Sequence, residues 1–411
     1  MLHDDHDVIR ARFIRERNQR LILRLMFRAG LLSQSKAVQK TGLKAPTVFR
    51  IFTELEQKGL IEAANGTDVG RHGEDPQPAR KGRRPLEYRL KPDAAYIVGI
   101  DFWARSAAAV VQDFAGNQIA SRSLCFSSPP SADEACAIIA HLIRDMLDGA
   151  GIDSQRLLGI GVGAPGSVGA LTGVVHFYSR IPGMIEYPLG ARLQEAFAAP
   201  VIVTNNASIA ALAEERYGKA HGAASLFCFL VRAGVGGAYL QNGKLISDRS
   251  RTAFEVGHLS MDPHGRECSC GNRGCLELYL NEDAACAALS ALAPCPDMET
   301  LDAIIAQGSP EVERLLEPLL EAASHAVKDI RRLLAPEAIA IITRSKAFSE
   351  LIVKAASADL VNFDARFGPS GARLIASEYN AQLACKAACD LVYEAFFSHG
   401  LERSDQGGHE Q

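Results

Sequence analysis

The sequence predicts an α/β protein in which a small helical module precedes a larger body of alternating strands and helices. Two patterns among the 411 residues carry this prediction. Apolar side chains recur at helical spacing over residues 18–60, and from residue 95 short apolar runs alternate with helical stretches. Such alternation is typical of layered α/β folds. One histidine and three cysteines within eighteen residues further predict a metal-bound loop inside the body.

The bulk composition is that of an ordinary globular protein, with 47% hydrophobic and 22% charged residues. The first residues, MLHDDHDVIRARFIRER, are charged and lack the apolar centre of a secretion signal. No stretch has the apolar length that spanning a membrane requires. We therefore expect a cytoplasmic protein with no membrane partner, whose ten cysteines stay reduced and favour metal ligation over disulfides.

Charge is divided unevenly along the chain. Residues 1–91 carry 19 Lys and Arg against 11 Asp and Glu, whereas the rest carries 25 against 37. A basic N-terminal module on an acidic body is typical of a nucleic-acid-binding head attached to a sensor.

Three short helices are predicted in the head. The first covers residues 18–29 and ends at Gly30, and Ser33 then caps a second helix that ends at Gly42. Pro46 suits the first turn of a third helix. The apolar residues of this helix follow the spacing i, i+3, i+4, i+7 and are Val48, Ile51, Phe52 and Leu55. Two helices joined by a tight glycine turn predict a helix-turn-helix, whose last helix enters the major groove of double-stranded DNA.

The outward face of the third helix carries the residues predicted to contact DNA bases. Thr47 and Arg50 lie on that face, with Phe49 at its edge. A polar loop follows and leads into LEYRL, a pattern typical of the wing of a winged helix. The loop concentrates four cations that we expect to bind DNA, namely Arg80, Lys81, Arg83 and Arg84. The alternative is a solvated linker behind an ordinary three-helix bundle.

The segment EVGHLSMDPHGRECSCGNRGCLE is the strongest chemical signal in the chain. It offers the four ligands of a tetrahedral Zn²⁺ site, which are His258, Cys268, Cys270 and Cys275. Gly271 and Gly274 stand where a chain that turns around an ion needs positive φ. The alternative of unrelated buried cysteines is disfavoured, because polar and glycine neighbours surround these three. The other seven cysteines are scattered and are expected to be small core residues.

The same segment, read as H-x9-C-x-C-G-x2-G-C-x-E, resembles the signature of the ROK family of repressors, open reading frames and kinases. The resemblance extends from about Asn18 to Phe397 and includes the sugar repressors of the N-acetylglucosamine and xylose type. It implies a winged helix-turn-helix over residues 1–92 and a two-lobed, actin-like body of the sugar kinase and Hsp70-like ATPase type. One lobe would cover residues 93–206 with a C-terminal helix at 380–400, and the other residues 207–379 with the zinc loop 255–277.

The resemblance also implies which residues face a sugar in the cleft between the lobes. Glu255, His258 and Glu277 would contact sugar hydroxyls, and Asn205 matches another hydroxyl-binding position. A zinc-bound histidine keeps its second ring nitrogen free for such a ligand. Arg180 stands where relatives have a sugar-contacting asparagine, so we include it among the ligand-binding residues.

Four departures from the kinases of this family predict that phosphoryl transfer is lost. Asn206 replaces the aspartate that acts as the catalytic base, and Trp103 fills a glycine position of the first phosphate loop. The second phosphate loop, which begins at Arg232, lacks its threonine, and residues 343–346 replace a glycine run near the adenine. We therefore expect no enzymatic activity. The glycines within residues 234–237 are expected to form a hairpin turn instead.

Asn206 also bears on the charge of the ligand. An amide removes the negative charge of the aspartate and keeps a hydrogen-bond donor, and Arg180 or Arg232 would add positive charge if either faced the cleft. The site is therefore expected to accept a neutral sugar or a 6-phosphosugar. The neutral sugar is favoured because most of the retained contacts are hydroxyl partners.

Together these features predict a sugar-responsive transcriptional regulator, a repressor of carbohydrate-use genes that binds operator DNA as a homodimer or a dimer of dimers. Sugar binding would change the closure of the lobes and, through the linker near Ala95, the spacing of the two heads. Two alternatives stand beside it. One is a sugar kinase with an unusual nucleotide site, and the other is a DNA-binding regulator that responds to no ligand because its body is vestigial.

Overall fold

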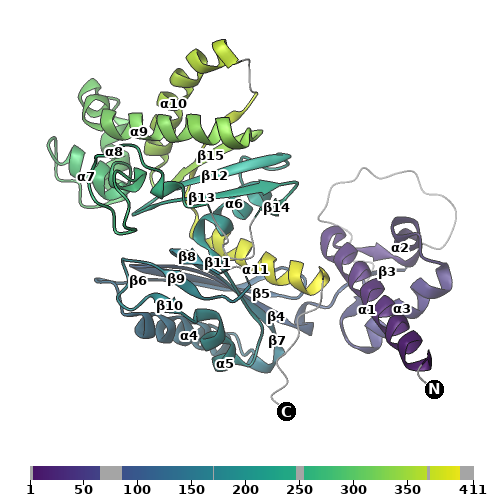
Figure 1. Cartoon of the computed structure of the whole chain (residues 1–411). Coiled ribbons are helices and arrows are strands. Elements are labelled where there is room, and N and C mark those ends of the chain that lie inside the picture. Colours follow the sequence, from purple (N-terminus) through teal and green to yellow (C-terminus); the bar gives the residue numbers. More distant parts are fainter. Residues whose placement is uncertain (1–2, 65–85, 170, 247–253, 368–370, 399–411) are drawn as a thin grey trace.

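A computed structural model describes residues 3–64, 86–169, 171–246, 254–367 and 371–398 of the chain, without the side chains of residues 3–13 and 362–367. These residues form a head and a larger body that contains two five-stranded sheets (Figure 1). Within these ranges, no helix combines the length and the apolar character that crossing a membrane demands.

The head consists of three helices and a small antiparallel sheet. Its elements are α1 (His3–Ala29), β1 (Leu32–Ser33), α2 (Gln34–Thr41), α3 (Ala45–Gln57), β2 (Ile61–Ala63) and β3 (Glu87–Leu90). The Ser33 side chain accepts a hydrogen bond from the backbone N–H of Lys36, and Gly42 ends α2 with a φ of 69°. The three helices expected in the head are therefore present, in the expected order.

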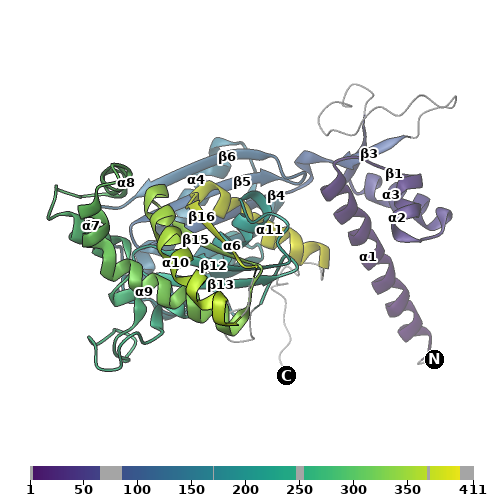
Figure 2. The same ribbon diagram turned by 90° about the horizontal axis from the view of Figure 1, so that it is seen from above.

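The first helix is longer than the sequence suggested, because α1 begins at His3 rather than at Asn18. Residues 3–17 carry four acidic residues, four arginines and five apolar residues. Arginine is a favourable helix former, which supports the continuation of the helix through this segment. This extension points away from the sheets of the body (Figure 2).

The predicted wing lies outside the described residues, and with it the four cations Arg80, Lys81, Arg83 and Arg84. The strands on either side, β2 and β3, pair antiparallel with Glu62 opposite Arg89. The chain therefore enters and leaves this loop on neighbouring strands.

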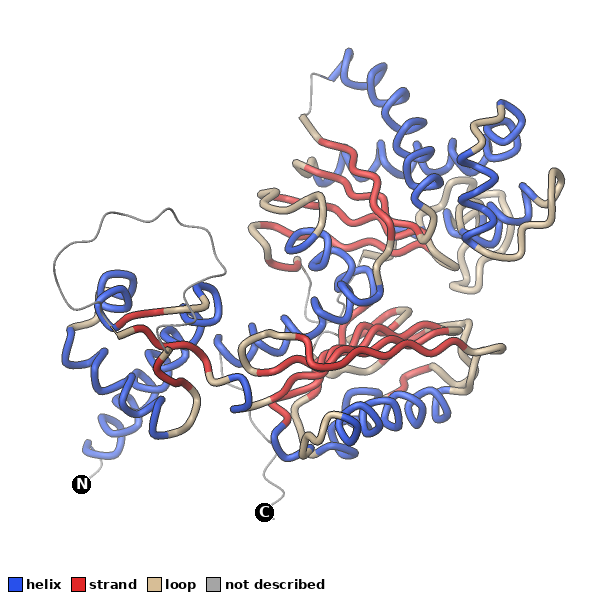
Figure 3. The backbone as a smooth tube through the Cα atoms, turned by 180° about the vertical axis from the view of Figure 1, so that it is seen from behind, coloured by secondary structure: helices blue, strands red, loops and turns tan. Residues whose placement is uncertain are grey.

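The first sheet of the body has the strand order β11-β7-β4-β5-β6. Its strands are β4 (Tyr96–Trp103), β5 (Ser106–Asp113), β6 (Gln118–Cys125), β7 (Leu157–Ala164) and β11 (Val201–Asn205). Helices α4 (Ala132–Gly149) and α5 (Leu189–Phe197) cover its outer face (Figure 3). A small antiparallel sheet of β8 (Ser167–Val168), β9 (Val175–Phe177) and β10 (Ile185–Tyr187) follows β7.

The second sheet has the strand order β14-β13-β12-β15-β16. Its strands are β12 (Ser225–Val231), β13 (Val235–Gln241), β14 (Lys244–Leu245), β15 (Ala338–Thr343) and β16 (Arg373–Glu378). The helices on this side are α7 (Glu282–Leu289), α8 (Met298–Ala306), α9 (Pro310–Leu334) and α10 (Lys346–Phe367). Buried apolar side chains of β12 and β15 pack against α9 and α10 and form one core.

Two helices, α6 (Asn206–Tyr217) and α11 (Ala381–Ser398), lie between the two sheets (Figure 1). Helix α11 rests on β4 and β7, where glycines allow its backbone to approach. A Cβ on Gly99 would lie 1.9 Å from the carbonyl oxygen of Cys385, and one on Gly161 would lie 2.0 Å from that of Ala388. These contacts fix α11 on the first sheet.

One hydrophobic core joins the head to the body. It contains Ile22, Leu23 and Met26 of α1 together with Tyr393 and Phe397 of α11. The head is therefore packed directly against the C-terminal helix, besides being connected through the chain near Ala95.

Two expectations about local structure are wrong. Gly236 and Gly237 belong to strand β13, and the turn of this hairpin lies at residues 232–234. Gly237 is needed within the strand because a Cβ there would lie 2.7 Å from the ring of Phe227. The cysteines outside the metal loop are also not all isolated core residues. Cys125 is exposed, and Cys286 and Cys295 contact each other.

Candidate functional site

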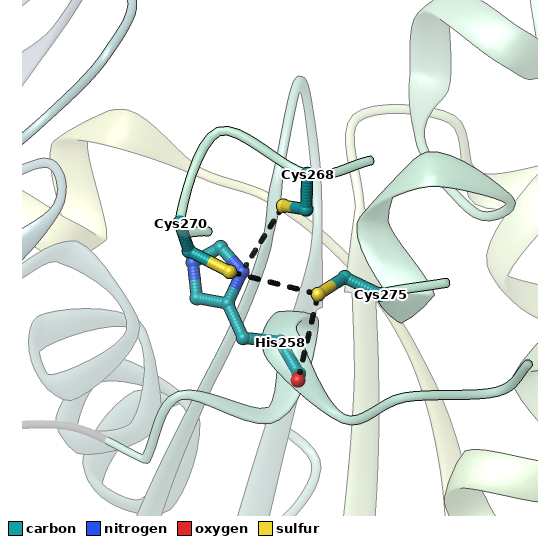
Figure 4. A group of neighbouring side chains, drawn as sticks. All are labelled: His258, Cys268, Cys270 and Cys275. Atoms are coloured by element: carbon teal, nitrogen blue, oxygen red, sulfur yellow. Dashed lines mark hydrogen bonds between the residues drawn. The ribbon is translucent and has the colours of Figure 1, made fainter. Parts of the chain in front are cut away.

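The predicted metal ligands lie together. One ligand atom from each of His258, Cys268, Cys270 and Cys275 lies within 4.8 Å of all the others (Figure 4). The sulfur of Cys268 lies 3.7 Å from Nδ1 of His258, and the sulfurs of Cys270 and Cys275 are also 3.7 Å apart. Three thiols and one imidazole nitrogen converging in this way fit a soft divalent ion in tetrahedral coordination.

The local backbone explains how this short loop closes. His258 ends a turn of 3-10 helix, and isolated bridges pair Ser260 with Cys275 and Glu267 with Arg273. Gly271 and Gly274 have φ values of 88° and 62°, as expected for the turns. A Cβ on Gly274 would lie 1.9 Å from the carbonyl oxygen of Asp262, so that position requires glycine.

The thiols of this cluster differ in their protonation. Burial raises the pKa of Cys268, and it raises the pKa of Cys275 to about 12. Burial acts in the same direction on Cys270, but the backbone N–H of Asn272 and the neighbouring thiols outweigh it and lower that pKa. A bound divalent cation would favour the thiolate of all three, so metal binding would release protons.

A cavity of about 900 Å³ opens between the two sheets beside this loop. Its walls come from the β8–β10 segment and the start of α6 on one side, and from the metal loop on the other. All the residues predicted to bind a ligand line it, namely Arg180, Asn205, Asn206, Glu255, His258 and Glu277. The sulfur-bearing Cys270 lines it as well, so the metal loop forms part of the cavity wall.

Glu277 connects the metal loop to the cavity. Its Oε1 lies 3.7 Å from Nδ1 of His258 and accepts a hydrogen bond from the Cys268 thiol at 3.4 Å. Nδ1 of His258 therefore faces the sulfurs, which leaves Nε2 as the nitrogen available to a ligand.

Asn206 is oriented by its two hydrogen bonds. Its Nδ2 donates to Oδ1 of Asp101 at 2.9 Å and to the main-chain oxygen of Phe102 at 3.1 Å. Because a carbonyl oxygen only accepts, this assignment of the amide is fixed. Oδ1 of Asn206 is buried and has no hydrogen-bond partner in the described structure. Nδ2, the donor that the sequence suggested for a ligand, is thus used within the protein.

Asn205 lines the cavity and also stabilises the local structure. Its Oδ1 accepts a hydrogen bond from the backbone N–H of Ala207 at 2.7 Å and so caps α6. Its Nδ2 donates to the main-chain oxygen of Gly166 in the loop after β7. Asn205 therefore holds the loop at the base of the cavity.

Arg232 is held in an aromatic stack beyond Asn206. Its guanidinium carbon lies 3.9 Å from the centre of the Trp103 ring and 4.6 Å from that of Tyr379. Trp103 Nε1 donates to Asp101 at 2.9 Å. Burial raises the pKa of Asp101, against the opposing charge of Arg232. Tyr379 also lines a small pocket of about 30 Å³ between α6, β15, β16 and α11.

Arg180 bridges the two sides of the cavity. Its Nη1 lies 3.2 Å from Oδ2 of Asp283 at the start of α7, and its Nη2 donates to the main-chain oxygen of Ala233. Arg180 is therefore paired with Asp283, whereas Arg232 packs on aromatic rings and its buried Nε has no hydrogen-bond partner in the described structure.

On the head, α3 buries one face and exposes another. Phe49 is 60% exposed and the Arg50 side chain 66% exposed, and Thr47 is half-buried. Glu54 on the same helix binds Arg15 and Gln19 of α1, and the hydrogen bond from Arg15 lowers its pKa.

Sequence reasoning missed a pair of residues in the cavity wall. Nδ1 of His176 lies 3.0 Å from Oε1 of Glu186, and both residues line the cavity. Glu186 has a φ of 46°, a left-handed conformation that costs a non-glycine residue about 1 kcal/mol or more. The hairpin of β9 and β10 brings the two together. No local pattern marks residues ten positions apart as partners, so only the strand pairing reveals them.

Comparisons with known proteins agree with these observations. The chain is 28% identical to the xylose repressor of Bacillus subtilis (strain 168) over 282 residues, which cover 68% of this chain and 69% of that protein. A crystal structure of a ROK family transcriptional regulator, a homologue of the E. coli MLC protein, covers 93% of this chain and 97% of its own. It shares 19% identity with this chain and has a TM-score of 0.75.

A second solved structure is a ROK family glucokinase from Streptomyces griseus in complex with glucose and AMPPNP. It covers 72% of this chain and 99% of its own, at 23% identity and a TM-score of 0.62. These two structural likenesses show the fold, an α/β body shared by regulators and sugar kinases. The family model described as ROK family matches residues 97–367, which is more than half of the chain. The chain therefore belongs to the ROK family.

Proposed function

We propose that this chain is a sugar-responsive transcriptional repressor, whose head binds operator DNA and whose body binds a sugar without phosphorylating it. The name of the xylose repressor similar to this chain supports the proposal, and so does the joining of a basic head to a body with a large cavity.

The head, residues 1–92, would act as a winged helix. Helix α3 would lie in the major groove with Arg50 and Thr47 toward the bases, because its opposite face is buried in the head. The exposed Phe49 would contact a thymine methyl group. The four cations of the predicted wing would bind phosphates and contribute most of the salt dependence.

The body would bind the sugar between two lobes, residues 93–206 with 380–400 and residues 207–379. The cavity has the size that small-molecule sites have, and carboxylates and amides in its wall suit the donors and acceptors of a sugar ring. A structural Zn²⁺ held by the four clustered ligands would fix the ring of His258, and Glu255 and Glu277 would bind hydroxyls beside it.

The packing of Arg232 on Trp103 and Tyr379 is the main support for the proposal that the body does not phosphorylate the sugar. In kinases that this chain resembles, positions 103 and 232 belong to phosphate loops. Here the guanidinium carbon of Arg232 packs 3.9 Å from the centre of the Trp103 ring. Asn206 also lacks the basicity of a catalytic aspartate. A nucleotide would have to displace this packing.

The polarity of the cavity favours a neutral sugar over a phosphosugar. Nδ2 of Asn206 donates to Asp101 and Phe102, so this amide is not poised to donate to a phosphate oxygen. Arg180 is bound by Asp283 and Ala233, and Arg266 by the main-chain oxygen of Leu278. The arginines of the wall thus have protein partners, which leaves less positive charge for a phosphate group.

Two helices would carry the response from the cavity to the head. Helix α6 begins at Asn206 in the cavity wall, and Arg216 near its end pairs with Asp390 of α11 at 2.8 Å. One turn further on, Tyr393 packs on Phe27 of α1 with ring centres 4.3 Å apart. A sugar that shifts α6 would therefore move the head through α11 as well as through the linker near Ala95. In a homodimer or a dimer of dimers, such a shift would change the spacing of the two heads.

Two assays on the full-length protein distinguish the proposal from its alternatives. The first measures ATP turnover with a panel of sugars, and the second measures affinity for DNA from upstream of its own gene, with and without each sugar. A repressor of the proposed kind gives no sugar-dependent ATP turnover and a sugar-dependent DNA affinity. Sugar phosphorylation would identify a kinase, and DNA binding indifferent to every sugar would identify a regulator without a ligand.

A further inference from the structure

Two cysteines outside the metal loop form a close pair in the second half of the body. Cys286 lies on α7, and Cys295 lies in the segment between α7 and α8. Their sulfurs are 3.2 Å apart. A disulfide bond is about 2.05 Å long, so about 1 Å of approach separates this contact from a covalent bond.

The pair is not suited to hold a metal. Among the described residues, the loop with His258 is the one group of three or more His, Cys, Asp or Glu whose ligand atoms converge. The further contacts of the pair are with the main-chain oxygen of Asp297, 3.7 Å from Cys286 and 3.8 Å from Cys295. Two thiols without further side-chain ligands do not make a tetrahedral zinc site.

The pair is open to a small oxidant on one side. Cys286 is half-buried and Cys295 is 8% exposed, so a reagent reaches the first sulfur and the second lies directly behind it. This is the arrangement in which a mixed disulfide on one thiol is resolved by its neighbour.

We propose that Cys286 and Cys295 form an intramolecular disulfide when the protein meets a low-molecular-weight disulfide such as oxidised glutathione, and that this bond ties α7 to the segment before α8. In the first step the thiolate of Cys286 attacks one sulfur of oxidised glutathione, forms a mixed disulfide and releases one reduced glutathione. In the second step the thiolate of Cys295 attacks the sulfur of Cys286 and releases the other. Two protein thiols are oxidised and one glutathione disulfide is reduced.

The position of the bond connects it to the ligand cavity. Helix α7 is capped by Asn281, which lines the cavity, and its first turn carries Asp283, the partner of Arg180. The bond would close a ring of ten residues and restrict the C-terminal half of the same helix. Oxidation would therefore stiffen the element that anchors the Arg180 bridge across the cavity.

The rate of the reaction should depend on pH. Burial raises the pKa of the Cys286 thiol to about 12, and the contact with Cys295 and the charges of Asp283 and Glu282 act in the same direction. Arg344, which donates to Glu282, is the cation that interacts with the same thiol. Because the thiolate is the attacking species, bond formation should be slow at pH 7 and about tenfold faster for each pH unit up to pH 9.

The test uses the full-length, zinc-loaded protein, since bound zinc protects the thiolates of the metal loop. After treatment with oxidised glutathione at pH 9, free thiols are alkylated and the protein is mapped by mass spectrometry. The expected product is a cross-link between Cys286 and Cys295 that raises the apparent unfolding midpoint by about 5 °C and is reversed by dithiothreitol.

Three variants make the result decisive. Cys286→Ser and Cys295→Ser should each abolish both the cross-link and the rise in midpoint, whereas Cys125→Ser, at an exposed thiol on β6, should leave both unchanged. A stable glutathione adduct on Cys286 without an internal bond would overturn the proposal. A cross-link that leaves the unfolding midpoint unchanged would contradict the claim that the disulfide stiffens α7.

Discussion

At the residue scale, the amide of Asn206 is oriented by contacts that the sequence does not reveal. Asn206 uses its Nδ2 to bind Asp101 and Phe102, and its Oδ1 is buried without a hydrogen-bond partner in the described structure. The sequence shows that an amide stands where related kinases have a carboxylate, but not which end of the amide binds Asp101. The orientation of the amide depends on the main-chain oxygen of Phe102 in β4. A contact between residues so far apart in the chain cannot be read from the sequence.

Replacing Asn206 with Asp tests this orientation. The new carboxylate would face Asp101 and the Phe102 carbonyl, so its pKa in the folded state would be raised above the unfolded value. Stability is then retained below the unfolded pKa and lost as pH rises through the folded pKa. We expect Asn206→Asp to lose about 1–3 kcal/mol of unfolding free energy at pH 8 and distinctly less at pH 5.

The matched control is Asn206→Ala, which loses the same hydrogen bonds without adding a charge; because only the pKa of Asp101 then changes, its loss of stability should differ less between pH 5 and pH 8 than that of Asn206→Asp. Thermal unfolding at pH 5 and pH 8 measures the difference. The same loss in both variants at both pH values would show that Nδ2 does not face Asp101.

The clustering of His258, Cys268, Cys270 and Cys275 is the part of the candidate site that close spacing in the sequence predicted best. We expect one Zn²⁺ per chain, and Cys270→Ser should release it, lower the unfolding midpoint by several degrees and weaken the response to the sugar. Cys125→Ser is the control for loss of a thiol. Elemental analysis that finds well under one equivalent of zinc in a protein with a full sugar response would contradict this expectation.

At the element scale, periodicity and caps predicted the helices of the head and the strands at the centre of each sheet. Ser33 and Gly42 mark the ends of α2 as expected, and β4, β7, β12 and β15 follow the apolar runs. Strand β6 is largely exposed, so no apolar run indicated it. The early start of α1 and the packing of α1 on α11 were missed as well, because they depend on contacts between residues far apart in the chain.

The proposed role of helix α3 in DNA recognition can be tested by removing one exposed arginine. Arg50→Ala should weaken binding to the operator by about 1–3 kcal/mol, with a smaller effect on unrelated DNA. The double change Arg83→Ala with Arg84→Ala should weaken binding to both and lower the salt slope by about 2. Lys354→Ala on α10 removes one positive charge from the body and serves as the control for Arg50→Ala. Unchanged affinity in both head variants at moderate salt would contradict the assignment of head and wing.

The contact between α6 and α11 can be weakened without removing an ion pair. Tyr217 donates a hydrogen bond to Asp390 at 2.5 Å, so Tyr217→Phe should cost about 1 kcal/mol of stability and leave the fold intact. We expect the affinities for sugar alone and for operator alone to stay within about twofold, while the effect of sugar on operator binding shrinks. Tyr239→Phe in the second sheet is the control. An undiminished effect of sugar would show that the signal does not pass through this contact.

At the scale of the whole molecule, the central claim is that sugar and operator DNA favour different conformations of the protein. Each therefore weakens the binding of the other, without any chemical reaction. A coupling of this kind is reciprocal, because the factor by which sugar changes operator affinity must equal the factor by which operator changes sugar affinity. A kinase with a DNA-binding head, or a regulator with a vestigial body, has no reason to show it.

The most direct measurement is a calorimetric titration of the same sugar into the free protein and into its operator complex, without nucleotide. For a repressor that sugar releases from DNA, we predict that the sugar binds the complex more weakly by a factor of about 5–150, equal to the loss of operator affinity at saturating sugar. Equal sugar affinity in the two titrations would contradict the account.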